Sequence, residues 1–527
     1  MSLQKKLVLT VGLVIFQITL FAQDIDVVHY VFNLTVYDAH DTLRGEAEIT
    51  FRPQTETDKV SFDLQTFNPS SGAGMRISRV HWADAEVTFQ HQENKITIQA
   101  NKLFAPRKNT KLVIAYAGVP ADGLIIGNNK FGERTFFGDN WPNRAHHWLP
   151  CKDHPGDKAT VEFKVTAPEH YQVIANGWQV EETNLPGSYK YTHWKENVAL
   201  PTKVMVVGIA RFAVRQEEAV EGIPLSSWVY PQDRNAGFND YALAQYCLRY
   251  FIETIGPYPF EKLANVQSKT SYGGMENAGN IFYFEGSVTG RGDHEELIAH
   301  EVAHQWFGNS ATEADWPHIW LSEGFATYLT NMYFEHSQGE EKIRSMLQKQ
   351  REAVVTFAKR QWTPIVDTVT QPLIRLLNTN SYQKAGWVLH MLRQEVGDGK
   401  FMAGLKKYYY TYALKNATTD DFKLIMEEES GFELDPFFEQ WLYQAGHPRL
   451  KISWHQDKDY LQLDITQLQE EKFSFPLDVQ IKLHNGVMDF PGLAMSNKQH
   501  TWSFKVNGTV QDINVDPEVK VLVEVVK

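Results

Sequence analysis

The residues best suited to chemistry in this chain are two histidines on either side of a glutamate, in the pentad His300-Glu301-Val302-Ala303-His304. The surrounding residues have helical periodicity, and we expect Asp293 to cap this helix and Gly308 to end it. On a helix, a spacing of four places the two imidazoles about 40° and one turn apart, where both can bind one metal ion. Glu301 lies about 100° round from His300, where it can contact a metal-bound water without being a ligand. The pentad therefore predicts a metal site with a general base beside it.

A glutamate on the next expected helix, PHIWLSEGFATYLTNMYF, is the candidate third ligand. Pro317 fits the first turn of this helix, and Glu323 faces its apolar side between Trp320 and Thr327. A buried carboxylate is costly unless it is paired or coordinated, so metal binding would explain its position; an ion pair with an arginine or lysine is the alternative. Two histidines and one glutamate with one open position form a catalytic zinc arrangement, whereas a structural zinc is normally closed by a fourth protein ligand.

The composition narrows the class of protein that carries these residues. The chain has 527 residues, 43% hydrophobic and 22% charged, which argues against wholesale disorder and a polytopic membrane protein. Its net charge of −13 argues against nucleic acid as a partner. Only two cysteines occur, Cys151 and Cys247, so any metal must be bound by histidines and carboxylates. One disulfide between them is possible, and two buried free thiols are the interpretation that we favour.

Residues 1–22 have the pattern of a signal peptide. A basic start, MSLQKK, is followed by an apolar run from Leu7 to Phe21, and Ala22 precedes the polar residues QDID. The run has 15 residues, fewer than the roughly 20 needed to span a bilayer, so cleavage after Ala22 is favoured over an uncleaved anchor. We therefore expect an exported protein, periplasmic or secreted, with no membrane span after cleavage.

Three further regions differ in the periodicity of their apolar residues, which predicts a multidomain α and β protein. Residues 23–214 contain short alternating runs such as RGEAEITFRP separated by turn residues, which predicts an N-terminal all-β domain. Residues 215–446 carry long helical periods and are expected to be mainly helical. Residues 447–527 alternate again, which predicts a small β domain.

Several longer motifs occur in a fixed order along the chain. SYGGMENAGN at residues 271–280 precedes HEVAHQWFGN, and 18 residues separate His304 from Glu323 in WLSEGFATY. Together with LPCKDHP, SYQKAGWVL and WLYQAGHPRL, these motifs resemble the zinc aminopeptidase family (M1) typified by aminopeptidase N and leukotriene A4 hydrolase. The resemblance covers nearly the whole chain after residue 22. It implies an N-terminal β domain, a thermolysin-like catalytic domain with one Zn²⁺ per chain, and a small C-terminal β-sandwich.

The resemblance also implies roles that the residues alone leave open. GGMEN by itself would be a turn with a solvated glutamate, but in the family this glutamate binds the free α-amine of the substrate and the glycines contact its backbone. A substrate-binding role is therefore implied for Gly273, Gly274, Met275 and Glu276. Tyr382 by itself would be an interfacial tyrosine at the start of a helix capped by Asn380 or Ser381. In the family, the matching tyrosine donates its hydroxyl to the developing oxyanion.

One position departs from the family pattern. Members usually carry a second carboxylate or a glutamine about ten residues before the cysteine of the LPC segment, where it makes a second contact with the amine. Trp141 occupies that position here. Asp139 or Asn140 could substitute for it, which leaves the second amine contact unassigned.

Together these residues predict aminopeptidase hydrolysis of peptides that have a free N-terminus. Zinc held by His300, His304 and Glu323 would lower the pKa of its water, and Glu301 would take the proton as hydroxide attacks the first peptide carbonyl. A thermolysin-type endopeptidase is an alternative, but it should lack an amine selector such as GGMEN. An inactive relative used as a binding or adhesion module is another, but it would normally have lost a ligand or the base. The preferred first side chain and the oligomeric state are not encoded in any of these motifs.

Overall fold

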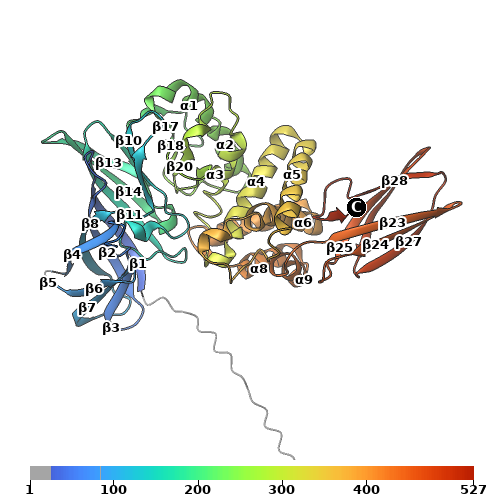
Figure 1. Ribbon diagram of the computed structural model, residues 1–527, viewed down its shortest axis with the longest axis horizontal. Helices are drawn as coiled ribbons and strands as arrows, with labels where there is room; N and C mark the ends of the chain where they lie inside the picture. The colour runs from blue at the N-terminus through green and yellow to red at the C-terminus, as the bar shows by residue number, and fades with distance from the viewer. Residues whose placement is uncertain (1–24, 84, 527) are drawn as a thin grey trace, which may run out of the picture.

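The computed structural model describes residues 25–83 and 85–526, so the expected signal peptide at residues 1–22 lies outside the described residues. A β-rich N-terminal part, a mainly helical middle and a second β part follow one another along an elongated molecule (Figure 1). This order of β-rich and helical parts confirms the coarse prediction. In the part of the chain that the structure describes, no helix combines the length and hydrophobicity needed to cross a membrane.

The N-terminal part is built on an eight-stranded sheet, with a three-stranded and a four-stranded sheet beside it. Strand β2 shows why it forms, since buried residues alternate with more exposed ones along its whole length. In spatial order, the large sheet consists of β13 (Trp178–Leu185), β14 (Tyr189–Pro201), β11 (Lys158–Pro168), β1 (Ile25–Thr35), β2 (Leu43–Pro53), β8 (Thr110–Val119), β4 (Gly74–Trp82) and β5 (Ala85–Glu86). The smaller sheets are β3 (Thr57–Asp63), β7 (Lys95–Phe104) and β6 (Thr88–Gln92), and β12 (Gln172–Ala175), β15 (Val207–Ala210), β10 (Arg134–Gly138) and β9 (Leu124–Asn128).

The middle part contains a five-stranded sheet that the helical periodicity did not predict. Strands β17, β18 and β20 run parallel, and the short strand β19 pairs antiparallel with β20 at one edge. The order is β16 (Ala213–Gln216), β17 (Leu225–Val229), β18 (Leu263–Ser268), β20 (Asn280–Phe284) and β19 (Gly274–Met275). A second pair of short strands, β21 (Thr312–Glu313) and β22 (Asn416–Ala417), joins two distant loops.

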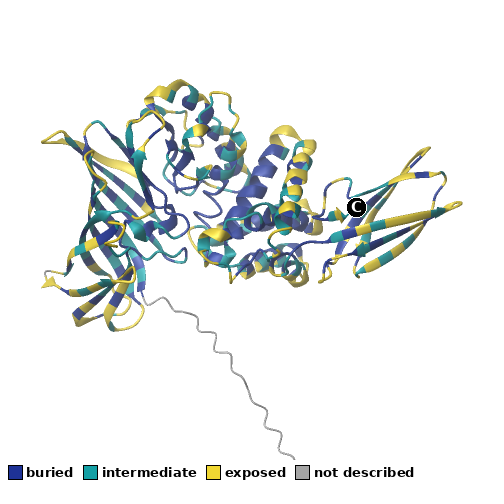
Figure 2. Cartoon of the chain, viewed as in Figure 1, coloured by how far each residue is buried: buried dark blue, intermediate teal, exposed yellow. Residues whose placement is uncertain are grey.

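Helices make up most of the remainder of the middle part. Every residue of α4 from Trp320 to Phe334 is buried, so this helix forms the centre of the domain, while α5 beside it keeps an exposed outer face (Figure 2). The helices are α1 (Arg234–Tyr241), α2 (Ala244–Thr254), α3 (Glu295–Ala303), α4 (Trp320–Gln338), α5 (Glu340–Ala358), α6 (Ala385–Val396), α7 (Asp398–Tyr412), α8 (Thr419–Ser430) and α9 (Asp435–Phe438).

The C-terminal part contains two sheets. The first consists of β27 (Gln499–Lys505), β24 (Tyr460–Gln467), β23 (Arg449–Asp457) and β29 (Glu524–Val526); the second of β26 (Gly486–Met495), β25 (Phe475–Leu483) and β28 (Val510–Val515). Cys151 and Cys247 are free and buried, which confirms the interpretation that we favoured.

Candidate active site

The two histidines of the pentad come from the last turn of α3. The helix begins at Glu295 and ends at Ala303, and His304 follows with backbone angles that are still helical. The expected cap by Asp293 is wrong, because the Asp293 carboxylate pairs with Arg291 and no side chain caps the helix. The helix also ends before Gly308, but His304 keeps the one-turn spacing that brings both imidazoles together.

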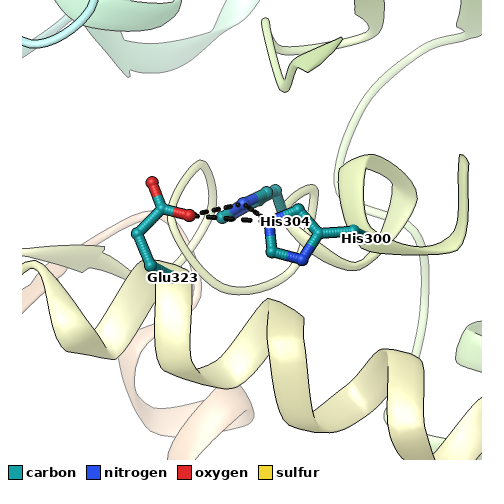
Figure 3. A group of neighbouring side chains, drawn as sticks. All are labelled: His300, His304 and Glu323. Atoms are coloured by element: carbon teal, nitrogen blue, oxygen red, sulfur yellow. Dashed lines mark hydrogen bonds and ion pairs between the residues drawn. The ribbon is translucent and has the colours of Figure 1, made fainter. Parts of the chain in front are cut away.

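His300, His304 and Glu323 converge on one point (Figure 3). The two Nε2 atoms are 3.1 Å apart, and Glu323 Oε2 lies 3.6 Å from Nε2 of His300 and 3.2 Å from Nε2 of His304. Ligands about 2.0–2.1 Å from a tetrahedral zinc lie roughly 3.3–3.4 Å from one another. The spacing and chemistry of these three groups therefore fit one zinc ion.

The surroundings favour the metal-binding form of Glu323 and of His300, whereas Glu323 beside His304 outweighs burial and raises the pKa of that imidazole to about 9. Burial alone would raise the pKa of Glu323, but the two imidazoles outweigh it and hold the pKa well below its usual range, so the carboxylate is ionised. Burial lowers the pKa of His300, which favours the neutral imidazole. His304 Nδ1 lies 3.2 Å from the Phe307 carbonyl oxygen and 3.2 Å from Ser322 Oγ, contacts that fix the orientation of the ring.

Glu301 lies against the edge strand β19. The residue is 4% exposed, and a Cβ atom added to Gly274 would come within 2.4 Å of Glu301 Oε1. Only glycine at 274 therefore leaves room for the carboxylate. Burial raises the pKa of Glu301 well above its usual value, which suits a group that has to accept and hold a proton.

Glu276 follows β19 and is 4% exposed. Its Oε1 has no hydrogen-bond partner among the residues that the structure describes. Its backbone carbonyl accepts two side-chain hydrogen bonds, from Gln305 Nε2 at 2.8 Å and from Asn309 Nδ2 at 2.5 Å. Gln305 Oε1 in turn accepts from the Gly279 amide at 2.9 Å. We call Gln305 and Asn309 the amide clamp; sequence reasoning missed it, although Gln305 directly follows His304 and Asn309 ends the same HEVAHQWFGN motif.

Tyr382 lies in a π-helical turn, Asn380–Lys384, directly before α6. The expected cap by Asn380 or Ser381 is wrong, because the Asn380 side chain bonds to Thr363 and Pro364 and the Ser381 hydroxyl bonds to the Leu376 carbonyl. The Tyr382 ring stacks on His300 with centroids 5.9 Å apart. Burial, and then the nearby carboxylates, raise the pKa of Tyr382 well above its usual value, so its hydroxyl remains a donor.

One cavity of about 230 Å³ collects all of these predicted residues. It is lined by Trp141, Tyr272, Gly273, Gly274, Met275, Glu276, Leu297, His300, Glu301, His304, Glu323, Leu377 and Tyr382. Asp139 and Asn140 do not line it. Asn140 bonds instead to the carbonyls of Thr202 and Met205 and to the Trp148 indole, and Asp139 pairs with Arg144. Trp141 is the residue of that segment that reaches the cavity.

Two histidines, a glutamate and an adjacent buried carboxylate around an open cavity are the arrangement of zinc hydrolase sites. The Peptidase family M1 domain matches residues 240–441, and the Peptidase M1 N-terminal domain matches residues 27–204. The chain belongs to peptidase family M1.

Individual proteins support this assignment. The chain is 28% identical over 459 residues to a glutamyl aminopeptidase of Bitis rhinoceros and to an aminopeptidase A of Gloydius brevicauda, covering 81% of this chain and 47% of each relative. It therefore spans about half the length of the curated relatives it matches. A crystal structure of an M1 zinc metallopeptidase from Deinococcus radiodurans has the same fold, with a TM-score of 0.69, 24% identity, and coverage of 81% of this chain and 95% of that chain.

Proposed function

We propose that this protein is a zinc-dependent aminopeptidase that removes the N-terminal residue from peptides. The observation that carries the proposal is the buried, unpartnered Oε1 of Glu276 in the same cavity as the group that fits zinc. A buried carboxylate oxygen without a partner is costly, and a substrate ammonium would satisfy it. Such a contact fixes the N-terminus beside the metal ligands, so that only the first peptide bond reaches them.

The roles of the remaining residues follow from their positions. Zinc held by His300, His304 and Glu323, one ion per chain, would supply Lewis acidity to the scissile carbonyl and to a water molecule. Glu301 would accept a proton from that water and deliver it to the leaving amine. The Tyr382 hydroxyl would donate to the carbonyl oxygen as negative charge develops there. Gly273 and Gly274 leave the edge strand open to the substrate backbone.

The proposal also covers the folds of the catalytic and C-terminal domains and the export of the protein. The parallel sheet with an antiparallel edge strand, followed by helices, supports a thermolysin-like catalytic domain, and the two C-terminal sheets support a β-sandwich. We also propose that residues 1–22 direct export to the periplasm or the outside of the cell. The domain boundaries at 214/215 and 446/447 stay predictions; the first falls within β16.

The competing functions are distinguishable at the same cavity. A thermolysin-type endopeptidase would not need the unpartnered Glu276, and an inactive binding relative would not need the complete set of ligands and base. The test compares aminoacyl anilides with their N-acetylated forms. We expect the free amines to be preferred at least about tenfold to a hundredfold in kcat/KM.

A pair of variants makes this test specific. Glu276→Gln should reduce turnover of the free amines and shrink the preference with zinc retained, whereas Glu253→Gln, at an exposed glutamate on α2, should change neither. Equal cleavage of acetylated and free substrates by the wild-type protein would refute the aminopeptidase function and favour a thermolysin-type endopeptidase instead.

A further inference from the structure

The residues that line the active-site cavity determine which N-terminal residue of a peptide substrate fits there. This inference rests on the proposed function. If the substrate amine contacts Glu276 and the first carbonyl lies beside His300 and Glu323, the first side chain is the part of the substrate between these two anchors. It must therefore lie in the same cavity of about 230 Å³. The chemistry of the remaining wall then determines the class of substrate.

That wall is apolar and aromatic. The lining residues that are neither metal ligands, acids nor glycines are Trp141, Tyr272, Met275, Leu297, Leu377 and Tyr382. The charged groups that line the cavity, apart from the two histidines, are the carboxylates of Glu276, Glu301 and Glu323, and no lysine or arginine is among the described residues that line it. An acidic first side chain would thus find no lysine or arginine on this wall as its counter-ion.

The arginine behind this wall is already neutralised. Arg144 lies 5.8 Å from the ring centroid of Tyr272. Its Nη1 bonds to Asp122 at 2.9 Å and its Nη2 pairs with Asp139, so two carboxylates share one guanidinium. Its Nε donates to the Trp141 carbonyl at 2.7 Å. No charge is left over for a substrate carboxylate.

The lysine behind the wall is neutralised as well. Lys203 Nζ lies 5.1 Å from the ring centroid of Trp141 and bonds to Glu313 Oε1 at 2.5 Å. Both side chains of this pair are at most 1% exposed. The Lys203 ammonium packs on the Trp141 ring and is not among the groups that line the cavity.

We infer that this cavity selects substrates with an uncharged apolar or aromatic first residue, and that Trp141 and Tyr272 determine this specificity. Some relatives are named glutamyl aminopeptidase, a name that refers to an acidic first residue. On this inference, the present chain prefers a different class of first residue. The gain comes from removing apolar side-chain surface from water against the rings. The rejection of acidic residues comes from placing a carboxylate against an apolar wall without a lysine or arginine, since the zinc would be held by its ligands and the substrate ammonium by Glu276.

The first test is a panel of aminoacyl anilides at fixed pH and salt concentration, assayed with the zinc-loaded full chain. It contains Leu, Phe and Met, the charged residues Glu, Asp, Lys and Arg, and Gln as the uncharged match for Glu. We expect Leu or Phe to exceed Glu by at least about fiftyfold in kcat/KM and Gln to fall between them. A charged first residue cleaved faster than both Leu and Phe would overturn the inference and leave the aminopeptidase intact. If no free-amine substrate were cleaved by zinc-loaded protein, the proposed function itself would fail.

Variants of Trp141 and Tyr272 test whether these two residues determine the specificity for the first residue. Trp141→Ala should lower kcat/KM for Phe about tenfold or more and for the small Ala substrate less than threefold, whereas Trp141→Phe should restore most of the Phe activity. Because Trp141 is 2% exposed, zinc content and melting temperature are measured in parallel. Tyr272→Ala is the second variant, since that side chain is only partly buried and its loss is less disruptive. An equal loss on Phe and Ala substrates in folded, zinc-loaded forms of both variants would refute the specificity role.

Discussion

The half of the cavity that we propose binds metal and the half that we propose selects the substrate are assembled in different ways. The metal-binding half comes from one helix and the start of the next, since His300 and His304 belong to the end of α3 and Glu323 to the first turn of α4. The selecting half comes from segments far apart in the sequence, with Trp141 in the β-rich N-terminal part and Glu276 after β19. Chemistry is thus encoded locally, whereas selectivity depends on how distant segments pack.

This difference has a physical cause. The distance between two imidazoles at i and i+4 depends only on helix geometry, which any α-helix supplies. The distance between Trp141 and Glu276 depends instead on how the N-terminal part packs against the middle part, including the buried ion pair of Lys203 with Glu313 of β21. Perturbing the two halves should therefore have different signatures, the first in metal content and turnover and the second in substrate preference.

The largest effect is expected in the metal-binding half. His300→Ala, His304→Ala and Glu323→Ala should each lose the approximately one zinc per chain, and activity should fall at least about a thousandfold. Zinc content is measured by atomic absorption and activity with a Leu anilide. Glu301→Gln is the matched control on the same helix, because it should keep zinc and still lose most turnover. Full zinc in all three ligand variants would contradict the site, and zinc loss in Glu301→Gln would make Glu301 a ligand.

A smaller effect is expected for Tyr382, which lies between the two halves. Tyr382→Phe keeps the ring that stacks on His300 and removes only the hydroxyl donor. We expect kcat to fall about a hundredfold or more, with unchanged zinc content and melting temperature. Steady-state kinetics separate the two parameters, and a change confined to KM would exclude the oxyanion role and move Tyr382 into the selecting half.

The same contrast explains how much of the molecule could be predicted from its sequence. Alternation along β2 identified that strand correctly, since its periodicity follows from one buried face, and the helix α4 was also identified correctly although it is buried on all sides from Trp320 to Phe334. The parallel strands of the middle sheet were missed because all six residues of β18 are buried, so no alternation marks it. The two candidate histidine ligands were predicted from a spacing that a helix fixes, and Glu323 from the cost of a carboxylate on the apolar side of the next helix.

The substrate-selecting half could not be predicted from the sequence, because its contacts join residues from different helices, strands and loops. The roles of Glu276 and Tyr382 came from motif resemblance, and no local pattern shows that Trp141 rather than Asp139 or Asn140 reaches the cavity. The expected cap at Asp293 failed for a local reason, because pairing with Arg291, two residues earlier in the same loop, competes with the cap. Hydrogen bonds between a loop and a helix end, such as the amide clamp, depend on a tertiary fit that the residue types alone do not specify.

The smallest effect is expected at the amide clamp, which joins the two halves. Gln305 follows His304 directly and holds the carbonyl of Glu276, so it relates the position of the amine anchor to that of the metal ligands. Gln305→Leu removes this donor and the acceptor of the Gly279 amide, and leaving buried groups unpaired costs about 1–3 kcal/mol. We expect kcat/KM to fall about tenfold, mainly through KM, and the preference for free over acetylated substrates to shrink, with zinc retained. Gln267→Leu is the matched control, since Gln267 is also buried and bonds to Tyr230, Asp233 and Glu285 but not to Glu276. Both variants should lower the melting temperature, and only Gln305→Leu should change the preference; an equal change in both would mean that the clamp stabilises the fold without positioning the anchor.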